Sequence, residues 1–186
     1  MRTGETLDDA AILAMLRSDK DRDRGFRVLI SRYGDRLYRH IHRLCDNPSD
    51  ADDILQETLI KVFRHAGQFE GRSRFYTWLY RVATNEALSF LQHKSKSGMG
   101  EEGARELGRM YADPWWDTDE AWRSLEAAIR ELPDKQRAVF NLRYFEEMSY
   151  EEMSQILDTS VGALKASFHH ALKKVERHLR DSQSQI

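Results

Sequence analysis

Hydrophobic residues recur along this chain at the three- and four-residue spacing of amphipathic helices. The longest stripe lies between Asp21 and Cys45 and consists of Phe26, Leu29, Ile30, Tyr33, Leu37, Ile41 and Leu44. This spacing places side chains on one face of a helix, and we expect that face to be buried. Sustained alternation of apolar and polar residues, the pattern of a half-buried strand, is nearly absent from the sequence. The pattern therefore predicts an all-α fold.

Four helices are expected in the first half of the chain: about 8–16, 21–45, 49–64 and from residue 75 onward. Asn47-Pro48 should end the second helix, and Ser49 is the expected N-cap of the third. The acidic residues after Ser49 suit the positive end of a helix dipole. The expected inner face of this third helix is Leu55, Leu59 and Val62.

Residues 94–118 differ in character from the helical segments on either side. They are rich in Gly, Ser and charged residues and show little periodicity, which is typical of a linker. Trp115-Trp116 is too apolar for a free tether, so we expect this end to dock on a neighbouring surface. The sequence thus predicts two small helical domains, residues 1–93 and 119–186, joined by a flexible linker at 94–118.

The second domain has the pattern of a helix-turn-helix. Pro133 suits the first turn of a helix that reaches about Phe145. Ser149 and Glu152 have capping-box spacing and should open a short helix. After a turn at 158–160, a longer helix carries the apolar stripe Val161, Leu164, Phe168, Leu172, Val175 and Leu179. Any pair of antiparallel helices can show this pattern, so the pattern alone leaves DNA binding open.

Arginines and aromatic residues are interleaved between Phe69 and Asn85. Arginines can neutralise phosphates, and aromatic faces can stack on bases lifted from a duplex. The segment contains Arg72, Ser73, Arg74, Phe75, Tyr76, Trp78 and Arg81. Helical spacing puts Trp78, Arg81, Asn85 and Ser89 on one side, opposite Phe75, Leu79, Val82 and Phe90. The alternative is that these aromatics simply fill a small helical core.

Two further faces are candidates for binding. In the third helix, Asp53, Glu57 and Arg64 surround Ile60, which a partner protein could cover. A solvated charged face with one stray aliphatic residue is the alternative.

In the last helix, the side opposite the apolar stripe has small residues near its start and basic residues near its end. These residues are Gly162, Ala163, Ala166, Ser167, His170, Lys173 and Lys174. Small residues permit close approach to a groove, and lysines can contact phosphates.

Composition narrows the class of protein. The 186 residues include 29 Lys and Arg against 31 Asp and Glu, a formal charge of −2, which argues against a polybasic nucleic-acid binder. No apolar run approaches the roughly 18 residues of a membrane helix, and the start of the chain lacks a basic flank ahead of its apolar residues. We therefore expect a cytoplasmic protein without membrane insertion.

No catalytic or cofactor motif is evident. Cys45 is the sole cysteine, so neither an intramolecular disulfide nor a cysteine-based zinc cluster can form, and a buried structural thiol is expected. The histidines are scattered, and the acidic residues after Ser49 suit a helix N-terminus better than a metal site. The expectation is a protein that is not an enzyme and has no cofactor and no metal.

With these motifs in order, the chain resembles the bacterial extracytoplasmic-function (ECF) sigma factors, which carry only the second and fourth sigma regions. The motifs that carry the resemblance are DADDILQETLIKVFRH, FEGRSRFYTWLYRVATNEAL, LPDKQRAVFNLRYFEEMSYEEMSQIL and SVGALKASFHHALKKV. Their order, and the linker between the second and third, cover most of the chain. The resemblance implies a transcription factor that binds core RNA polymerase, recognises promoter DNA and helps open it. It adds an anti-sigma factor to the expected partners.

The resemblance also implies residue roles. The helix from Asp50 to Arg64 would dock on the clamp helices of the polymerase, using Asp53, Gln56, Glu57 and Ile60. The loop Phe69 to Arg74 would capture a flipped base of the minus-ten element, while Trp78, Arg81 and Asn85 would hold the opened strand. The helix from Val161 would read the minus-thirty-five element in the major groove.

The chain departs from the family pattern at two places. Ser89 and Gln92 stand where the family has an acid and an arginine, which affects minus-ten preference. Ser167, His170 and Leu172 stand where arginines are common, so guanidinium contacts to guanine are lost. We expect weaker or differently specified duplex binding that relies on Lys165, Lys173 and backbone amides.

Two other functions compete with this interpretation. One is a helix-turn-helix regulator that binds duplex DNA without polymerase, which would not need the arginine-aromatic segment. The other is a helical adaptor that binds only proteins, which predicts no salt-dependent affinity for DNA.

Overall fold

The computed structural model describes residues 8–96 and 120–183. Within these ranges the chain forms eight α-helices and one short 3-10 helix, and no strand. The prediction of an all-α fold is confirmed. The predicted docking of Trp115-Trp116 lies outside the described residues.

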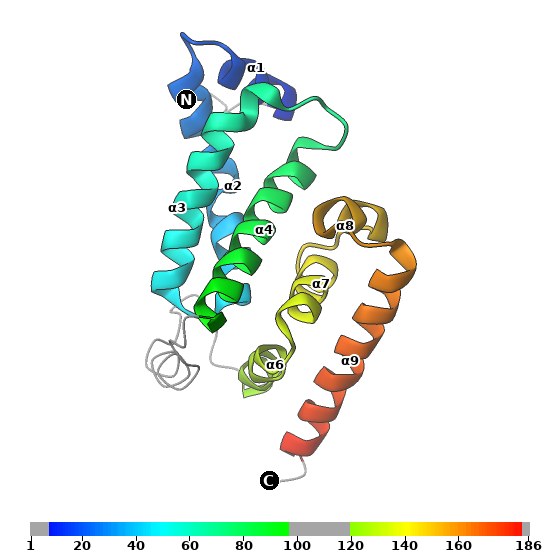
Figure 1. Cartoon of the computed structure of the whole chain (residues 1–186). Coiled ribbons are helices and arrows are strands. Elements are labelled where there is room, and N and C mark those ends of the chain that lie inside the picture. The colour runs from blue at the N-terminus through cyan, green and yellow to red at the C-terminus, as the bar shows by residue number, and fades with distance from the viewer. Residues whose placement is uncertain (1–7, 97–119, 184–186) are drawn as a thin grey trace, which may run out of the picture.

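The first unit of the structure consists of α1 to α4. Figure 1 shows α2, α3 and α4 side by side, with α1 across one end. The bounds are Asp9–Arg17 for α1, Arg22–Cys45 for α2, Pro48–His65 for α3 and Phe75–Lys96 for α4, with a 3-10 turn at Ala66–Gln68. Helix α4 therefore extends into the segment predicted as a linker.

The second unit consists of α6 to α9. Its bounds are Glu120–Arg130 for α6, Asp134–Tyr144 for α7, Tyr150–Leu157 for α8 and Val161–Gln183 for α9. Helix α6 has no counterpart among the predicted helices, although Leu125, Ala128 and Ile129 have helical spacing that could have predicted it. Helices α7 and α8 pack against α4 of the first unit, and α9 forms the outer edge of the second unit (Figure 1).

Capping explains where several helices begin. The predicted capping box of α8 is confirmed: the Ser149 hydroxyl accepts from the backbone N–H of Glu152 at 3.2 Å, and the Glu152 carboxylate accepts from the backbone N–H of Ser149 at 3.0 Å. The prediction of Ser49 as the N-cap of α3 is wrong. Asn47 is the N-cap and accepts from the backbone N–H of Asp50 at 3.0 Å. Pro48 then takes the first helical position, where its missing N–H costs nothing.

The predicted stripe of α2 is buried except at Phe26, which is half-buried, and at Ile30. Leu29, Leu37, Ile41 and Leu44 are fully buried, whereas Ile30 is 38% exposed. At this end α2 is covered by α1, which packs so closely beside Gly25 that an added Cβ there would lie 2.7 Å from Cβ of Met15. Ile30 projects about 100° around the helix from Leu29, beyond the reach of α1. The prediction that Ile30 is buried is therefore wrong.

The described residues form two clusters of buried apolar side chains. The larger one joins residues of α1 to α4 with residues of α7, α8, the turn between them and α9, among them Leu142, Met148, Met153, Ile156 and Leu164. The smaller one lies between α6, α7 and α9 and includes Ile129, Leu132, Phe140, Ala171 and Val175. The second unit thus has a core of its own and also contributes to the core that it shares with the first.

Candidate nucleic-acid and protein-binding surfaces

The loop before α4 is held by a cluster of three aromatic rings. The ring centroids of Phe69 and Phe75 lie 5.7 Å apart, and that of Trp78 lies 5.6 Å from Phe69 and 5.7 Å from Phe75. The Arg17 guanidinium of α1 donates to the backbone carbonyl of Phe69. Gly71 has a φ of +73°, a conformation that glycine adopts without strain, and turns the chain between these anchors.

Burial separates the aromatics of this segment into two groups. Phe69 is 9% exposed and Phe75 is 3% exposed, so neither ring is available to stack on a base in this structure. Their expected contact with DNA is corrected to a packing role, because both rings fill the space beneath the loop. Trp78 is half-buried and keeps part of its ring accessible.

The polar members of the segment lie outside this cluster. Arg72, Arg74, Arg81 and Asn85 are exposed, and Ser73 is half-buried. Helical spacing places Trp78, Arg81 and Asn85 on one side of α4. We call Arg72, Arg74, Trp78, Arg81 and Asn85 the Arg-Trp surface. It combines guanidinium groups, which can neutralise phosphates, with a half-buried indole, a ring type that can stack on a base.

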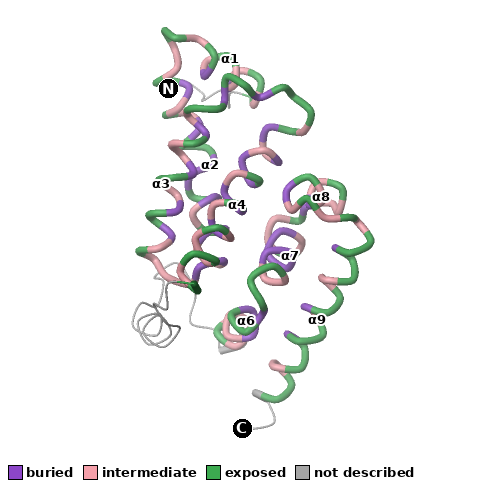
Figure 2. Tube along the Cα trace, viewed as in Figure 1, coloured by how far each residue is buried: buried purple, intermediate pink, exposed green. Residues whose placement is uncertain are grey.

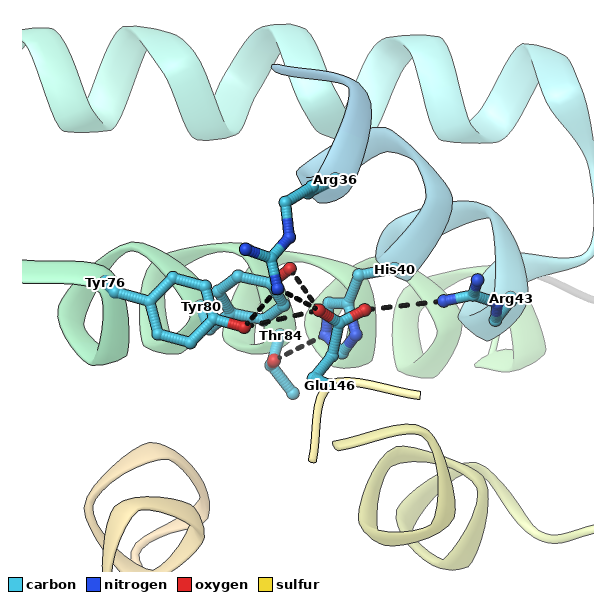
Figure 3. A network of polar contacts seen from close by, with 7 residues as sticks. All are labelled: Arg36, His40, Arg43, Tyr76, Tyr80, Thr84 and Glu146. Carbon is cyan, nitrogen blue, oxygen red and sulfur yellow. Dashed lines mark hydrogen bonds and ion pairs between the residues drawn. The ribbon is translucent and has the colours of Figure 1, made fainter. Parts of the chain in front are cut away.

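Tyr76 and Tyr80 point to a different side of α4 and meet a carboxylate from the second unit (Figure 3). The Glu146 carboxylate accepts from the hydroxyl of Tyr80 at 2.5 Å and from that of Tyr76 at 3.3 Å. It also pairs with the guanidinium of Arg36 at 3.5 Å and of Arg43 at 3.4 Å. We call these five residues the Glu146 cluster. Tyr76, predicted to contact DNA, is engaged here within the protein instead.

Burial changes the acidity of the groups in this cluster. It raises the pKa of Tyr76 to about 12 and raises that of Tyr80 further, so both hydroxyls keep their protons and donate hydrogen bonds to the Glu146 carboxylate. Burial lowers the pKa of Arg43, and Glu146 opposes that shift. The sequence gives no local signal for this cluster, because Tyr80 lies 66 residues and Arg36 lies 110 residues from Glu146.

His40 lies beneath the Glu146 cluster and is fully buried. Its Nε2 is 2.9 Å from the Thr84 hydroxyl, and its ring centroid is 5.0 Å from that of Tyr80. Burial, aided by the charge of Arg43, lowers the pKa of His40 from 6.5 to about 3. The folded protein therefore holds His40 neutral over the whole physiological range.

This burial predicts an acid-sensitive contribution to stability. Below a pH of about 6.5 the unfolded chain takes up a proton at His40 that the folded chain does not accept until a pH of about 3. The contribution of neutral His40 to the free energy of unfolding is therefore complete above the pKa that this residue has in the unfolded chain, and it is lost as the pH falls below that value. Between pH 7 and pH 5 we expect His40 to lower the free energy of unfolding by about 2 kcal/mol. Urea unfolding of wild type and His40→Leu at both values checks this, and equal pH dependence in the two proteins would contradict it.

The outer face of α3 carries the residues predicted to contact a protein. Asp53, Gln56, Glu57 and Arg64 are exposed, whereas Ile60 is half-buried. Together they form what we call the α3 surface. Ile60, which the sequence places on the outer face, is therefore only partly open to a partner. The inner face also differs from the prediction: Val62 is buried as expected, but Ala51, Ile54 and Thr58 are buried in place of Leu55 and Leu59, which are half-buried.

The helix-turn-helix geometry is present in α8 and α9. Asp158 ends α8 in the left-handed region at φ 49°, and the Ser160 hydroxyl accepts from the backbone N–H of Ala163 at 3.3 Å. The outer side of α9 is largely exposed (Figure 2). Six of its predicted contact residues are exposed: Gly162, Ala163, Lys165, Ala166, His170 and Lys173. The seventh, Ser167, is half-buried. We call these seven residues the α9 surface.

Several other expectations concern groups outside these surfaces. Cys45 is buried, as predicted, and burial raises the pKa of its thiol to about 12. In the described ranges, no three or more His, Cys, Asp or Glu side chains are placed to hold a metal ion. None of the described helices is both long enough and apolar enough to cross a membrane.

Comparison with known proteins decides the family. The family models for Sigma-70 region 2 and Sigma-70 region 4 match residues 29–97 and 122–175. The ECF RNA polymerase sigma factor SigW of Bacillus subtilis is 31% identical over 167 residues, which cover 84% of this chain and 89% of SigW. This chain belongs to the ECF sigma factors. The ECF RNA polymerase sigma-E factor of Haemophilus influenzae is 29% identical over 184 residues, which cover 93% of this chain and 95% of that protein.

Solved structures agree with the fold of this sigma factor. RpoE of Bartonella quintana, in complex with the anti-sigma factor NepR, has a TM-score of 0.67 at 20% identity and covers 83% of this chain and 96% of its own. CnrH, in complex with the cytosolic domain of CnrY, has a TM-score of 0.65 at 22% identity, with coverage of 93% and 97%. The predicted resemblance to sigma factors is confirmed. Sigma factors act in transcription initiation without being enzymes, which also confirms that this chain is not an enzyme.

Proposed function

We propose that this sigma factor binds core RNA polymerase through its first unit, reads promoter DNA with both units and melts the promoter at the Arg-Trp surface. The observation that carries the proposal is the presence of two unlike exposed surfaces on one chain, each of a kind that suits DNA. One combines arginines with a half-exposed tryptophan, and the other is an exposed helix of small and basic residues. The first suits unpaired bases and the second suits a duplex groove.

Melting requires no catalytic group in this chain. Opening a few base pairs costs unstacking and unpairing energy, which a captured base offsets when it stacks on a ring and its phosphates meet arginines. Trp78 offers the ring face, and Arg72, Arg74 and Arg81 offer the charges. Phe69 and Phe75, buried beneath the loop, hold the loop in position for this contact.

The α9 surface is the proposed reader of the minus-thirty-five element. Gly162, Ala163 and Ala166 allow the helix to approach a major groove, and Lys165 and Lys173 lie where they can contact phosphates. Ser167 and His170 can contact base edges but lack the bidentate geometry of arginine. We therefore infer that phosphate contacts carry a large share of the duplex affinity.

This assignment predicts the salt dependence of binding. Each of Lys165→Ala and Lys173→Ala should reduce the slope of log affinity against log salt by about 1, because each removes one phosphate contact. The loss should be similar on different promoter sequences. Titrations of polymerase bound to this chain on duplex promoter DNA at several salt concentrations measure the slope. Lys135→Ala, an exposed lysine of α7, is the control, and a slope equal to that of the control would remove the lysine from the interface.

The α3 surface is the proposed contact with core polymerase. Its exposed acids and amide surround the half-buried Ile60, so a partner would cover a small apolar centre within a polar rim.

We also propose the domain limits 1–93 and 119–186 with the linker 94–118. The proposed location is the cytoplasm, because polymerase and chromosome are found there. An anti-sigma factor is a further proposed partner. RpoE was solved in complex with the anti-sigma factor NepR, and CnrH in complex with the cytosolic domain of CnrY.

One binding experiment separates this function from the two alternatives. Affinity for promoter DNA, both duplex and single-stranded, is measured with and without core polymerase. The proposal predicts that polymerase is needed for tight binding and that single-stranded minus-ten DNA binds selectively. Tight duplex binding without polymerase would favour a regulator. Binding to polymerase without salt-dependent affinity for DNA would favour an adaptor.

A further inference from the structure

The two units of this chain are joined by a buried carboxylate. Glu146, in the turn between α7 and α8, reaches the first unit and has a side chain only 6% exposed. All four of its partners come from α2 and α4 (Figure 3). A buried carboxylate is costly unless its oxygens are satisfied, and here two hydroxyls and two guanidinium groups satisfy them. The contact is therefore specific and does not arise from chance proximity.

Other polar contacts extend this interface at both ends. Near the start of α4, the Arg74 guanidinium lies 3.6 Å from the Glu152 carboxylate of α8. At the far end of α2, the Arg130 guanidinium of α6 pairs with Asp46 at 2.7 Å. Arg137 of α7 donates to the carbonyl of Leu44 at 2.8 Å. These polar contacts thus join the second unit to the C-terminal half of α2 and to the first turns of α4.

Apolar packing fills the space between these contacts. The larger core cluster contains Leu142, Met148 and Met153 of the second unit together with buried residues of α2 and α4. Removing such groups from water stabilises the contact between the units. The closed arrangement is therefore a packed state of the free chain.

This closed arrangement conflicts with reading two separated promoter elements. Elements centred near minus ten and minus thirty-five lie about 25 base pairs apart, or about 85 Å along duplex DNA at about 3.4 Å per pair. A compact chain of this length has a radius of gyration of about 16 Å. The Arg-Trp surface and the α9 surface cannot span that distance while the units remain packed. This step rests on the proposed function.

We propose that Glu146 latches the free chain in a closed resting state, which must open before both promoter elements can be contacted. The closed state also covers part of the Arg-Trp surface. Glu152 pairs with Arg74, so a carboxylate of the second unit stands where a phosphate would approach that arginine. Removing the Glu146 charge takes a carboxylate away from the half-buried Arg43 guanidinium, which destabilises the closed state.

Small-angle scattering of the free chain tests the latch without polymerase or DNA. Glu146→Gln keeps the shape of the side chain and removes its charge, and Glu146→Lys places a cation against Arg36 and Arg43. The wild-type protein should have a radius of gyration of about 16 Å. The variants should exceed about 20 Å, the radius of gyration expected when the two units, each about half of the chain, no longer pack together. Glu147→Gln makes the same charge change at the neighbouring exposed position and should match wild type. An unchanged radius in both Glu146 variants would overturn the proposal.

Transcription with core polymerase tests the consequence of the latch. A chain that is mostly closed binds with an affinity reduced by its open fraction. The concentration of Glu146→Gln that gives half-maximal transcription should therefore be about tenfold lower than that of wild type, with Glu147→Gln unchanged. An enlarged radius without this shift would overturn the resting-state role. If no variant supports transcription, the proposed function fails, while scattering still decides whether the latch exists.

Discussion

Replacing Trp78 and Arg81 together with alanine is expected to slow promoter opening by about 100-fold while changing the affinity for core polymerase by less than about twofold. Stacking of one base on an aromatic ring contributes about 1–3 kcal/mol, and loss of a phosphate contact adds to it. A combined loss near 2.7 kcal/mol corresponds to the expected factor. Both side chains belong to α4 and not to the α3 surface, so the polymerase contact should remain. The rate is measured by permanganate reactivity of unpaired thymines in the promoter.

The tryptophan has a conservative variant that separates stacking from packing. Trp78 is half-buried and stacks on Phe75 with an interplanar angle of 20°. Trp78→Phe keeps an aromatic face and should retain most of the opening rate, whereas Trp78→Ala should not. An equal loss of polymerase binding and promoter opening in the double alanine variant would count against the role assigned to the Arg-Trp surface.

Reversing charge on α3 is expected to weaken polymerase binding without affecting the DNA surfaces. Glu57→Lys should lower the affinity for core polymerase by about 30-fold, because reversing a charge in the polar rim sets like charges against each other at a cost of about 2 kcal/mol. Ile60→Asp should have a similar or larger effect, because it places a charge in the apolar centre of the same surface. Affinity is measured by fluorescence anisotropy of the labelled chain titrated with core polymerase.

Two controls make this test specific. Ile60 is half-buried, so its aspartate variant can also destabilise α3, whereas Glu57 is exposed and should not. Circular dichroism therefore accompanies each binding curve. Asp35→Lys makes the same charge change at an exposed position of α2 outside the proposed surfaces and should bind normally. Unchanged affinity of folded Glu57→Lys and Ile60→Asp proteins would remove α3 from the interface.

Helical periodicity and capping residues were enough to predict most of the helices. The stripe of α2 and the capping box of Ser149 depend on residues close in sequence, and both were predictable for that reason. Local competition explains one error: Asn47 and Ser49 can both cap α3, and Pro48 decides in favour of Asn47. Ile30 shows a different limit, because its exposure depends on which side of α2 the short helix α1 covers.

The binding surfaces were only partly predictable for a related reason. Helical spacing correctly placed Arg81 and Asn85 on an exposed side of α4. It could not show that Phe69 is buried, since that depends on how the loop folds this ring onto Phe75 and Trp78. Nothing near Glu146 in the sequence distinguishes it from an ordinary exposed acidic residue. Its burial follows from the packing of two units, which no local pattern encodes.

The most direct test of the central claim is transcription in vitro with purified core polymerase on a pooled library of genomic promoter fragments, with and without this protein. The account predicts new discrete start sites only when the protein is present, with two shared sequence elements upstream of them. An absence of new starts, together with tight duplex binding that does not need polymerase, would contradict it.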